Sequence, residues 1–102
     1  MGFLSRLFGS SVDERLVDEI ISLLNRIDQI CEEDYSGATK EGTPLNNEWK
    51  TIDNRLYNIG QELYDKGGMN LMRKVYDRVY KKGRLTGRYL DHAWDGVGEW
   101  RG

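Results

Sequence analysis

The 102-residue chain has only one cysteine and one proline, so it has few residues that could cross-link the chain or interrupt a helix. A lone cysteine, Cys31, excludes an intramolecular disulfide, which predicts a reducing and therefore cytoplasmic environment. No apolar run approaches the roughly 18 residues of a membrane span, and residues 1–10 lack the continuous apolar core of a secretory signal. A chain of this length is expected to form one domain, residues 1–102, around a single modest core.

The chain also lacks a large net charge, but its charges are unevenly distributed. The formal net charge is −2. Between residues 12 and 34 there are eight acidic side chains and two basic ones, whereas between residues 69 and 90 there are seven basic side chains and one acidic one. We therefore expect an acidic helix and a basic helix that lie near each other and offset one another's field.

The first strong pattern starts at Ser11. Ser11 followed three positions later by Glu14 matches a capping box, in which each side chain satisfies a free backbone N–H at a helix start. Apolar residues then recur at helical spacing and predict a long amphipathic helix that runs to about Asp34. Residues 35–43 contain two glycines and no apolar period, which predicts a loop. The apolar stripe of this first helix comprises Leu16, Ile20, Leu23, Leu24, Ile27, Ile30 and Cys31.

A second helix is predicted to begin at Thr43, with Pro44 in the first helical position. Its apolar residues alternate in steps of four and three, a seam that suits antiparallel packing against the first helix. Gly67 and Gly68 are expected to end this helix and reverse the chain. The residues of the seam are Leu45, Trp49, Ile52, Leu56, Ile59 and Leu63.

A third apolar series runs from Met69 to Tyr80 and is expected to break or bend at Gly83. A shorter helical stretch follows, capped by Thr86 and reaching Trp94. No stretch alternates with period two for long enough to predict a strand. The expected fold class is all-α: an antiparallel helical hairpin closed by a third bent or broken helix, in a three- to four-helix bundle.

Candidate catalytic and metal-binding residues are few. His92 is the only histidine, and on a helix it lies one turn from Asp95, with Asp91 on the same face as Asp95. No second ligand-rich helix is evident, and Cys31 falls on an apolar stripe, where it acts as a small hydrophobic residue. We therefore expect no catalytic residues, no metal site and no cofactor, and we do not expect an enzyme.

The basic segment offers an alternative function. It interleaves cations with tyrosines, a mixture that nucleic-acid surfaces use for phosphate contact and base stacking. The tyrosines fall on the expected core-facing side, and the sequence pI of about 5.4 disfavours a dedicated nucleic-acid protein. Nucleic acid is thus a partner that the sequence allows but does not favour. The candidate contacts are Arg73, Lys74, Arg78, Lys81, Lys82, Arg84 and Arg88.

Apolar residues at both ends of the chain suggest a protein interface. Residues 1–10 form a short amphipathic segment that suits docking on the bundle, on a partner or on a membrane surface. Residues 96–102 form a tail that is expected first to fold back over the bundle as a lid, and second to expose its aromatic residue to a partner. The leading prediction is a small non-catalytic module for protein–protein interaction or homo-oligomerisation, and the alternatives are a nucleic-acid accessory protein and a peripheral membrane adaptor. The candidate interface comprises Phe3, Leu4, Leu7, Phe8, Val97 and Trp100.

Overall fold

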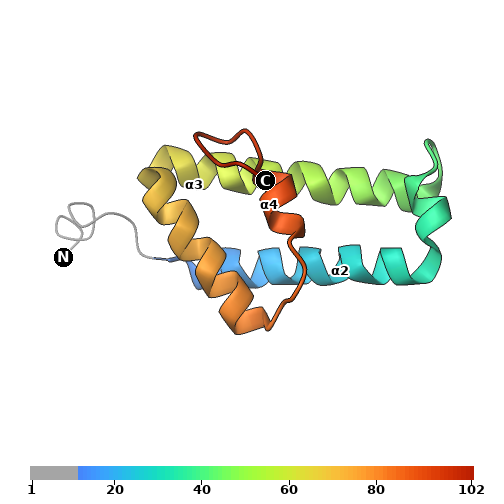
Figure 1. Cartoon of the computed structure of the whole chain (residues 1–102), viewed down its shortest axis with the longest axis horizontal. Helices are drawn as coiled ribbons and strands as arrows, with labels where there is room; N and C mark the ends of the chain where they lie inside the picture. The colour runs from blue at the N-terminus through green and yellow to red at the C-terminus, as the bar shows by residue number, and fades with distance from the viewer. Residues whose placement is uncertain (1–11) are drawn as a thin grey trace.

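The computed structural model describes residues 12–102, which form three helices (Figure 1). These are α2 (Glu14–Thr39), α3 (Pro44–Gly83) and α4 (Tyr89–Trp94). No strand occurs among residues 12–102, so the all-α prediction is confirmed for that part of the chain. The amphipathic segment of residues 1–10, with its candidate interface residues Phe3, Leu4, Leu7 and Phe8, lies outside the described residues. Within residues 12–102, no helix has both the length and the apolar character needed to cross a bilayer.

The start of α2 differs from the predicted capping box. Asp13 is the N-cap, and its carboxylate accepts a hydrogen bond from the backbone N–H of Arg15 at 2.9 Å. Asp13 thus fills the role that the sequence pattern assigned to Ser11, which lies outside the described residues. A short acidic side chain next to the first helical residue satisfies an otherwise free N–H, and its negative charge interacts favourably with the positive end of the helix dipole.

The predicted loop of residues 35–43 is mostly wrong, because α2 resumes after a break at Asp34. The backbone of Asp34 is non-helical, with φ −163° and ψ 84°. Its carboxylate accepts a hydrogen bond from the N–H of Gly37 at 3.0 Å, as an N-cap does, and so starts a further turn that ends at Thr39. The true connection to α3 is residues 40–43.

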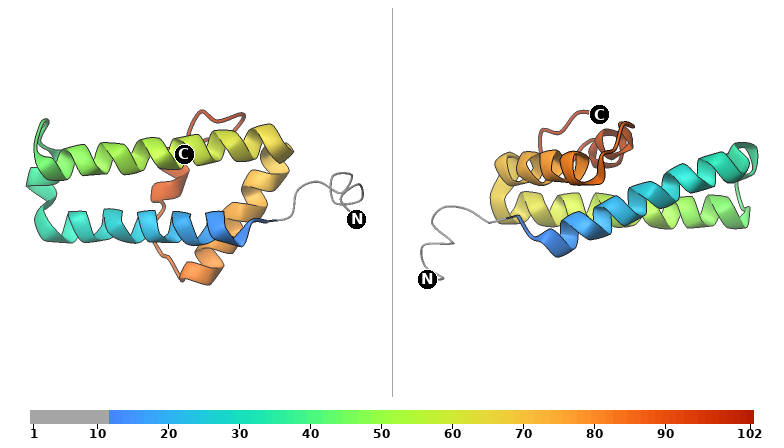
Figure 2. Two further views of the ribbon diagram at one scale, coloured as in Figure 1. Left: turned by 180° about the vertical axis from the view of Figure 1, so that it is seen from behind. Right: turned by 90° about the horizontal axis from the view of Figure 1, so that it is seen from below.

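The predicted boundaries of α3 are confirmed at its start and at its bend. Thr43 caps the helix by accepting from the N–H of Asn46 at 3.1 Å, and Pro44 follows in the first turn. Gly68 adopts φ 66° and ψ −160°, a left-handed backbone that a side chain would strain. This bend divides α3 into a first part, residues 44–67, and a second part, residues 69–83, which runs back across the start of α2 (Figures 1 and 2).

The first part of α3 lies beside α2 and runs in the opposite direction (Figure 1). Their shared core contains fully or nearly fully buried aliphatic side chains, most of them from the two stripes predicted above. Val17 is buried although the prediction omitted it, whereas the predicted Leu16 and Leu23 are only partly buried. Two bidentate ion pairs flank this core: Arg55 with Glu19, at 2.6 and 2.9 Å, and Arg26 with Glu48, at 2.6 and 2.8 Å. The core side chains shared by this pair are Val17, Ile20, Leu24, Ile27, Ile30, Ile52, Leu56, Ile59 and Leu63.

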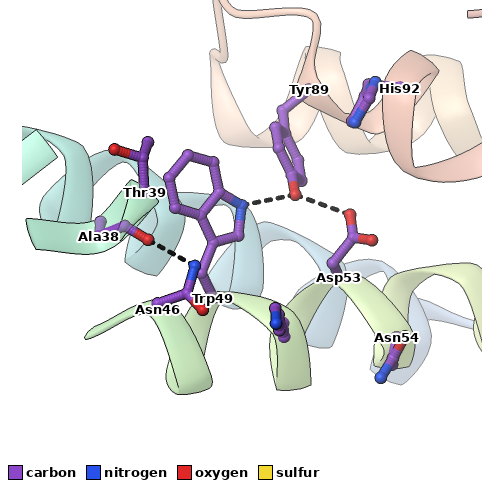
Figure 3. A pocket seen from close by; sticks show the side chains of 9 residues that line it. Ala38, Thr39, Asn46, Trp49, Asp53, Asn54, Tyr89 and His92 are labelled. Atoms are coloured by element: carbon purple, nitrogen blue, oxygen red, sulfur yellow. Dashed lines mark hydrogen bonds between the residues drawn. The ribbon is translucent and has the colours of Figure 1, made fainter. Parts of the chain in front are cut away.

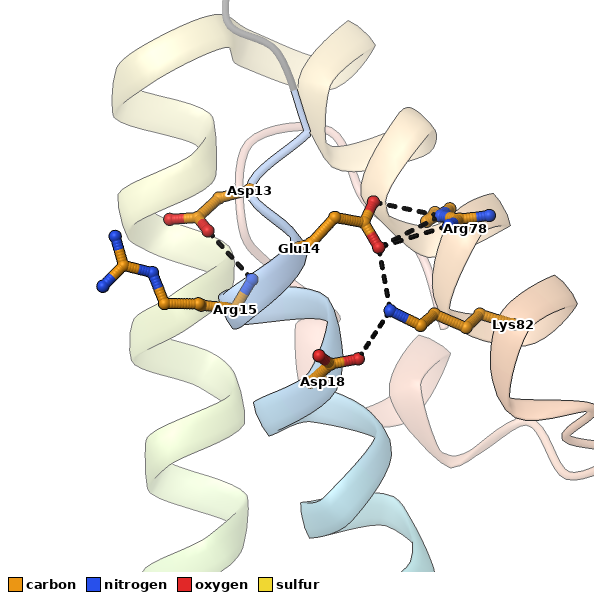
Figure 4. Close-up of polar contacts among 6 residues, drawn as sticks. All are labelled: Asp13, Glu14, Arg15, Asp18, Arg78 and Lys82. Atoms are coloured by element: carbon orange, nitrogen blue, oxygen red, sulfur yellow. Dashed lines mark hydrogen bonds and ion pairs between the residues drawn. The ribbon is translucent and has the colours of Figure 1, made fainter.

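The predicted proximity of acidic and basic helices is confirmed at the start of α2. Glu14 accepts hydrogen bonds from Arg78 at 3.0 Å and from Lys82 at 2.9 Å, and Lys82 also pairs with Asp18 at 2.8 Å (Figure 4). These contacts join the second part of α3 to α2. They hold the pKa of Glu14 below its ordinary value of 4.5, first through the hydrogen bonds from Arg78 and Lys82.

The helix predicted over residues 85–94 is shorter in the structure. Residues 85–88 have no helical structure, and α4 starts after Arg88 without a side-chain cap from the described residues, so the cap predicted at Thr86 is wrong. The position of α4 comes from Trp94, which is fully buried and donates its indole N–H to the carbonyl of Leu56 at 2.8 Å. Tertiary packing rather than a local cap therefore stabilises this helix and determines its position.

The tail folds back over the helices, so Val97 and Trp100 are removed from the candidate partner interface. Gly98 has φ 55°, and a side chain there would strike the ring of Tyr64. The turn places Trp100 edge-on to Trp94, with ring centroids 5.2 Å apart. Val97 is fully buried and Trp100 is 9% exposed, so neither side chain is available as an exposed anchor.

Candidate functional site

A pocket of about 410 Å³ opens between the end of α2, the first part of α3 and α4 (Figure 3). This volume falls in the range of small-ligand and side-chain pockets. Residues from all three helices contribute to its wall, so the folded chain rather than one segment creates it. The lining residues are Ala38, Thr39, Asn46, Trp49, Lys50, Asp53, Asn54, Tyr89 and His92.

Helix geometry explains why α3 supplies five of the lining residues. Asn46, Trp49, Lys50, Asp53 and Asn54 follow one another at steps of three, one, three and one, which places them on one face over about two turns. This face adjoins the apolar seam but carries polar and aromatic groups. These polar residues lie directly beside the buried seam and leave a site at the edge of the core instead of continuous apolar packing.

A chain of hydrogen bonds fixes the aromatic wall of the pocket. The indole N–H of Trp49 donates to the hydroxyl oxygen of Tyr89 at 2.7 Å, and that hydroxyl donates to Oδ1 of Asp53, also at 2.7 Å (Figure 3). Burial, followed by the hydrogen bond to Asp53, raises the pKa of Tyr89 far above its ordinary value of 10.0. The phenol therefore stays neutral across the physiological pH range and continues to donate its hydrogen bond to the carboxylate.

Asn46 has a buried oxygen that the described residues leave unpaired. The side chain is only 8% exposed. Its amide nitrogen donates to the carbonyl of Ala38 at 2.8 Å, which satisfies a free carbonyl near the end of α2. Its Oδ1 accepts a hydrogen bond from no residue that the structure describes. Buried polar atoms are nearly always paired, so this oxygen is an exception, and its complete burial closes it to a ligand in the pocket.

Aromatic and charged groups border the pocket. The ring of Tyr35, which is not a lining residue, lies 6.3 Å from that of Trp49, and Tyr35 is 60% exposed. Lys50 is paired with Glu41, so its ammonium group is already engaged at the surface. Asp53 is the only carboxylate among the lining residues. One carboxylate, the aromatic edge and the polar side chains of Asn54 and His92 thus remain for a ligand.

The residues considered for chemistry do not converge. The carboxylate of Asp91 is engaged by the hydroxyl of Tyr76 at 3.0 Å and by the indole N–H of Trp100 at 3.2 Å. His92 instead lines the pocket, with its ring 5.7 Å from that of Tyr89. Burial raises the pKa of the Cys31 thiol, which disfavours the nucleophilic thiolate. Within residues 12–102, no three histidine, cysteine or acidic side chains are grouped as metal ligands.

The candidate nucleic-acid contacts are all exposed, but they do not form one unpaired surface. Arg78 and Lys82 are engaged by acidic residues of α2, and Arg88 lies 3.4 Å from Asp91. Tyr76 packs against Tyr80 with ring centroids 4.6 Å apart, inside an aromatic cluster that includes Trp94 and Trp100. These tyrosines are therefore part of the packing, as expected, and are not presented for base stacking. The remaining exposed cations of the set are Arg73, Lys74, Lys81 and Arg84.

Sequence reasoning missed the pocket, although part of its signal was present. Trp49 was assigned to the core seam, but the structure leaves it half-buried at the edge of that seam. Asn46 and Asp53 lie seven residues apart on a face where a buried helix would carry apolar residues, which was a usable signal. The contribution of Tyr89, 40 positions from Trp49, depends on the chain reversal at Gly68 and has no local signature.

Comparison with protein-family models, with curated proteins and with solved structures gives no match for this chain.

Proposed function

We propose that the chain is a cytoplasmic, non-catalytic protein-binding module: a small bundle in which an antiparallel helix pair is closed by a bent third helix. Its binding site is the pocket described above, here called the Trp49 pocket. The observation that carries the proposal is the open aromatic wall formed by Trp49 and Tyr89 beside the exposed ring of Tyr35. The occupant is a segment of a partner protein.

The chemistry of protein interfaces supports this role for the Trp49 pocket. Tryptophan and tyrosine dominate binding hot spots, because they bury a large area at a small cost in side-chain entropy. Trp49 and Tyr89 are held in place by their mutual hydrogen bond, so little further ordering is needed when a partner binds. Preorganised aromatic groups around a concave site favour capture of a protruding side chain.

The same contacts support a non-catalytic function. A general acid–base pair requires groups near neutral pKa within hydrogen-bond reach of a reacting atom. In the Trp49 pocket the phenol of Tyr89 is held neutral, and its hydrogen bonds are used for structure. Burial raises the pKa of the Cys31 thiol, which lies outside the pocket lining, and so disfavours its thiolate. The hydrogen-bonded groups of the pocket thus position a ligand rather than transform it.

The alternatives receive less support from the described residues. Self-association through Val97 and Trp100 would require both buried side chains to leave the core. Nucleic-acid binding through the basic helix would compete with the ion pairs that Arg78 and Lys82 make with Glu14 and Asp18. Membrane association depends on residues 1–10, outside the described part of the chain.

The proposal is tested by selecting peptides that bind the chain from a random library displayed on phage. Selected peptides are measured against the wild type and against two variants, Tyr35→Ala beside Trp49 and Tyr57→Ala elsewhere on α3. Both tyrosines are exposed, at 60% and 41%, so the variants are matched in chemistry. Loss of a hot-spot aromatic costs on the order of 1.4 kcal/mol, so Tyr35→Ala is expected to weaken binding about tenfold. Tyr57→Ala is expected to change nothing.

Two results would refute the proposal. One is a selection that enriches no peptide above an unrelated helical protein. The other is a set of peptides that bind the wild type and Tyr35→Ala equally, because such peptides do not use the aromatic edge on which the proposal rests. The amide nuclear magnetic resonance spectrum of each variant is the control that it remains folded.

A further inference from the structure

We propose that residues 89–102, here called the clasp, dock on the rest of the chain and leave it as one unit, and that this motion assembles and dismantles the Trp49 pocket. The clasp comprises α4 and the tail. As far as it concerns a partner, this inference rests on the proposed function. It follows from the way in which α4 is held, through contacts to other elements rather than through its own helix.

The helix of the clasp has little stability of its own. α4 has six residues, and no side chain of the described residues caps it. A helix of this length does not form in water without packing. Residues 85–88, which connect α4 to α3, have no helical structure. In contrast, the second part of α3 is joined to α2 by ion pairs of Glu14 and Asp18, which do not involve the clasp. The clasp can therefore leave while the other helices stay together.

Two indole N–H groups hold α4 on the first part of α3. Trp94 of α4 donates to the carbonyl of Leu56 at 2.8 Å, and Trp49 of α3 donates to the hydroxyl oxygen of Tyr89 at 2.7 Å. Because Tyr89 and Trp94 belong to the same six-residue helix, departure of α4 breaks both bonds together. Tyr89 and His92 are also the residues of α4 that line the Trp49 pocket, so the pocket loses one wall when α4 leaves.

The tail is fixed to α4 at a place outside the Trp49 pocket. The indole N–H of Trp100 donates to Oδ1 of Asp91 at 3.2 Å, and its ring lies edge-on to Trp94 with centroids 5.2 Å apart. Neither Trp100 nor Asp91 lines the Trp49 pocket. The tail contact and the pocket are thus two separate sites that share α4, and a change in the docking of α4 affects both.

This arrangement couples the tail to the pocket. A ligand that contacts Tyr89 or His92 binds only the docked clasp, so it increases the free energy that undocking requires. The population of chains with Val97 and Trp100 released from the core then falls as the pocket is filled. Occupancy of the Trp49 pocket therefore controls the exposure of apolar side chains that are buried in the docked state.

Native-state hydrogen exchange of the full chain, without a ligand, tests the inference. Exchange is followed by nuclear magnetic resonance at the indole N–H groups of Trp49 and Trp94 and at the backbone N–H of Trp100, over a series of low urea concentrations. We expect these groups to approach one common rate, at least about tenfold faster than the backbone N–H groups of the buried Leu24 and Ile52. Equal rates at all five groups, or fast exchange at Trp100 alone, would overturn the inference.

Two variants identify the opening that is measured. Trp100→Phe removes the hydrogen bond to Asp91 but keeps an aromatic ring, and we expect about tenfold faster exchange at the indole N–H of Trp49. Ile20→Val is the control, because it weakens the buried core between α2 and α3. It is expected to accelerate exchange at Leu24 about fivefold and to leave the Trp49 indole unchanged. An unchanged Trp49 rate in Trp100→Phe, or a faster one in Ile20→Val, contradicts a separate opening of the clasp.

A selected peptide that binds at the Trp49 pocket separates this inference from the proposed function. At a concentration about 100 times its dissociation constant, the peptide is expected to slow exchange at Trp100 about a hundredfold, although Trp100 does not line the pocket. A peptide that slows exchange at Trp49 but not at Trp100 would leave the proposed function standing and refute the coupling. A selection that yields no peptide would refute the proposed function, whereas the rates without ligand still decide whether the clasp opens as one unit.

Discussion

Gly60 lies in the first part of α3 where the helix contacts the indole of Trp94. A Cβ atom added at Gly60 would lie 2.7 Å from Cδ1 and 2.8 Å from Nε1 of that ring. The ring is fully buried, and its N–H is fixed on the carbonyl of Leu56. The indole therefore cannot move away without losing a hydrogen bond. We predict that Gly60→Ala destabilises the chain, although alanine is the better helix former.

The sign of this effect follows from three opposing magnitudes. Replacing glycine by alanine inside a helix favours folding by about 1 kcal/mol. Overpacking a full core costs about 1–3 kcal/mol, and leaving the indole N–H of Trp94 and the carbonyl of Leu56 unpaired costs about 1–3 kcal/mol more. The net destabilisation is about 3 kcal/mol, which lowers the melting temperature of a domain of this size by about 12–24 °C.

Urea and thermal unfolding of four variants, Gly60→Ala, Gly87→Ala, Trp94→Phe and the Gly60→Ala/Trp94→Phe double variant, measures the effect. Gly87→Ala is the control, because nothing in the described residues lies within 4 Å of its added Cβ, and we expect it to be neutral or slightly stabilising. Adding Trp94→Phe to Gly60→Ala makes room for the methyl group, so the double variant is expected to be more stable than the sum of the single effects predicts. A stabilising Gly60→Ala, or strictly additive variants, would refute the proposed contact.

Three further predictions concern other contacts. Asn46→Ala removes the only hydrogen bond to the carbonyl of Ala38 among the described residues and is expected to cost about 1–3 kcal/mol in urea unfolding; no loss would contradict that role. A chain ending at Asp95 loses the cover that Trp100 gives to the core, so we expect a lower melting temperature and increased binding of a hydrophobic dye, and an unchanged melting temperature would contradict the packed tail. The folded-state pKa of Glu14 is lowered, so its stabilisation is present above pH 4.5 and is lost as the pH falls below that value; Glu14→Gln should weaken this acid dependence, and an identical pH profile would contradict the ion pairs in Figure 4.

Local patterns predicted the parts of the fold that local physics controls. The apolar periods located the faces of α2 and α3 that are buried in the structure. Thr43 with Pro44 predicted the start of α3, and Gly68 predicted the bend, because each of these residues acts on its own backbone. The break and restart of α2 at Asp34 also has a local cause, because the Asp34 carboxylate caps the new turn. From the sequence alone, an acidic residue inside a polar stretch is equally compatible with the end of a helix and with the N-cap of a new one.

Long-range contacts account for what could not be predicted. The Trp49 pocket depends on two long-range hydrogen bonds: Tyr89 to Asp53 spans 36 positions of the sequence, and Trp49 to Tyr89 spans 40. Both bonds exist only after α3 has bent and α4 has docked. The tail is buried because Trp100 contacts Trp94 and Tyr76, whereas the sequence alone favours a packed lid without excluding an exposed docking element. The burial of a terminal aromatic residue is decided by the surface available to it.

The most direct test of the central claim is a chemical-shift map of the full chain bound to its tightest selected peptide. A partner held in the Trp49 pocket predicts that the largest shifts occur at the indole N–H of Trp49 and at the backbone of residues 46–54 and 89–92. Shifts concentrated instead on the second part of α3, around Lys74 and Lys81, would contradict the account and assign binding to the basic helix.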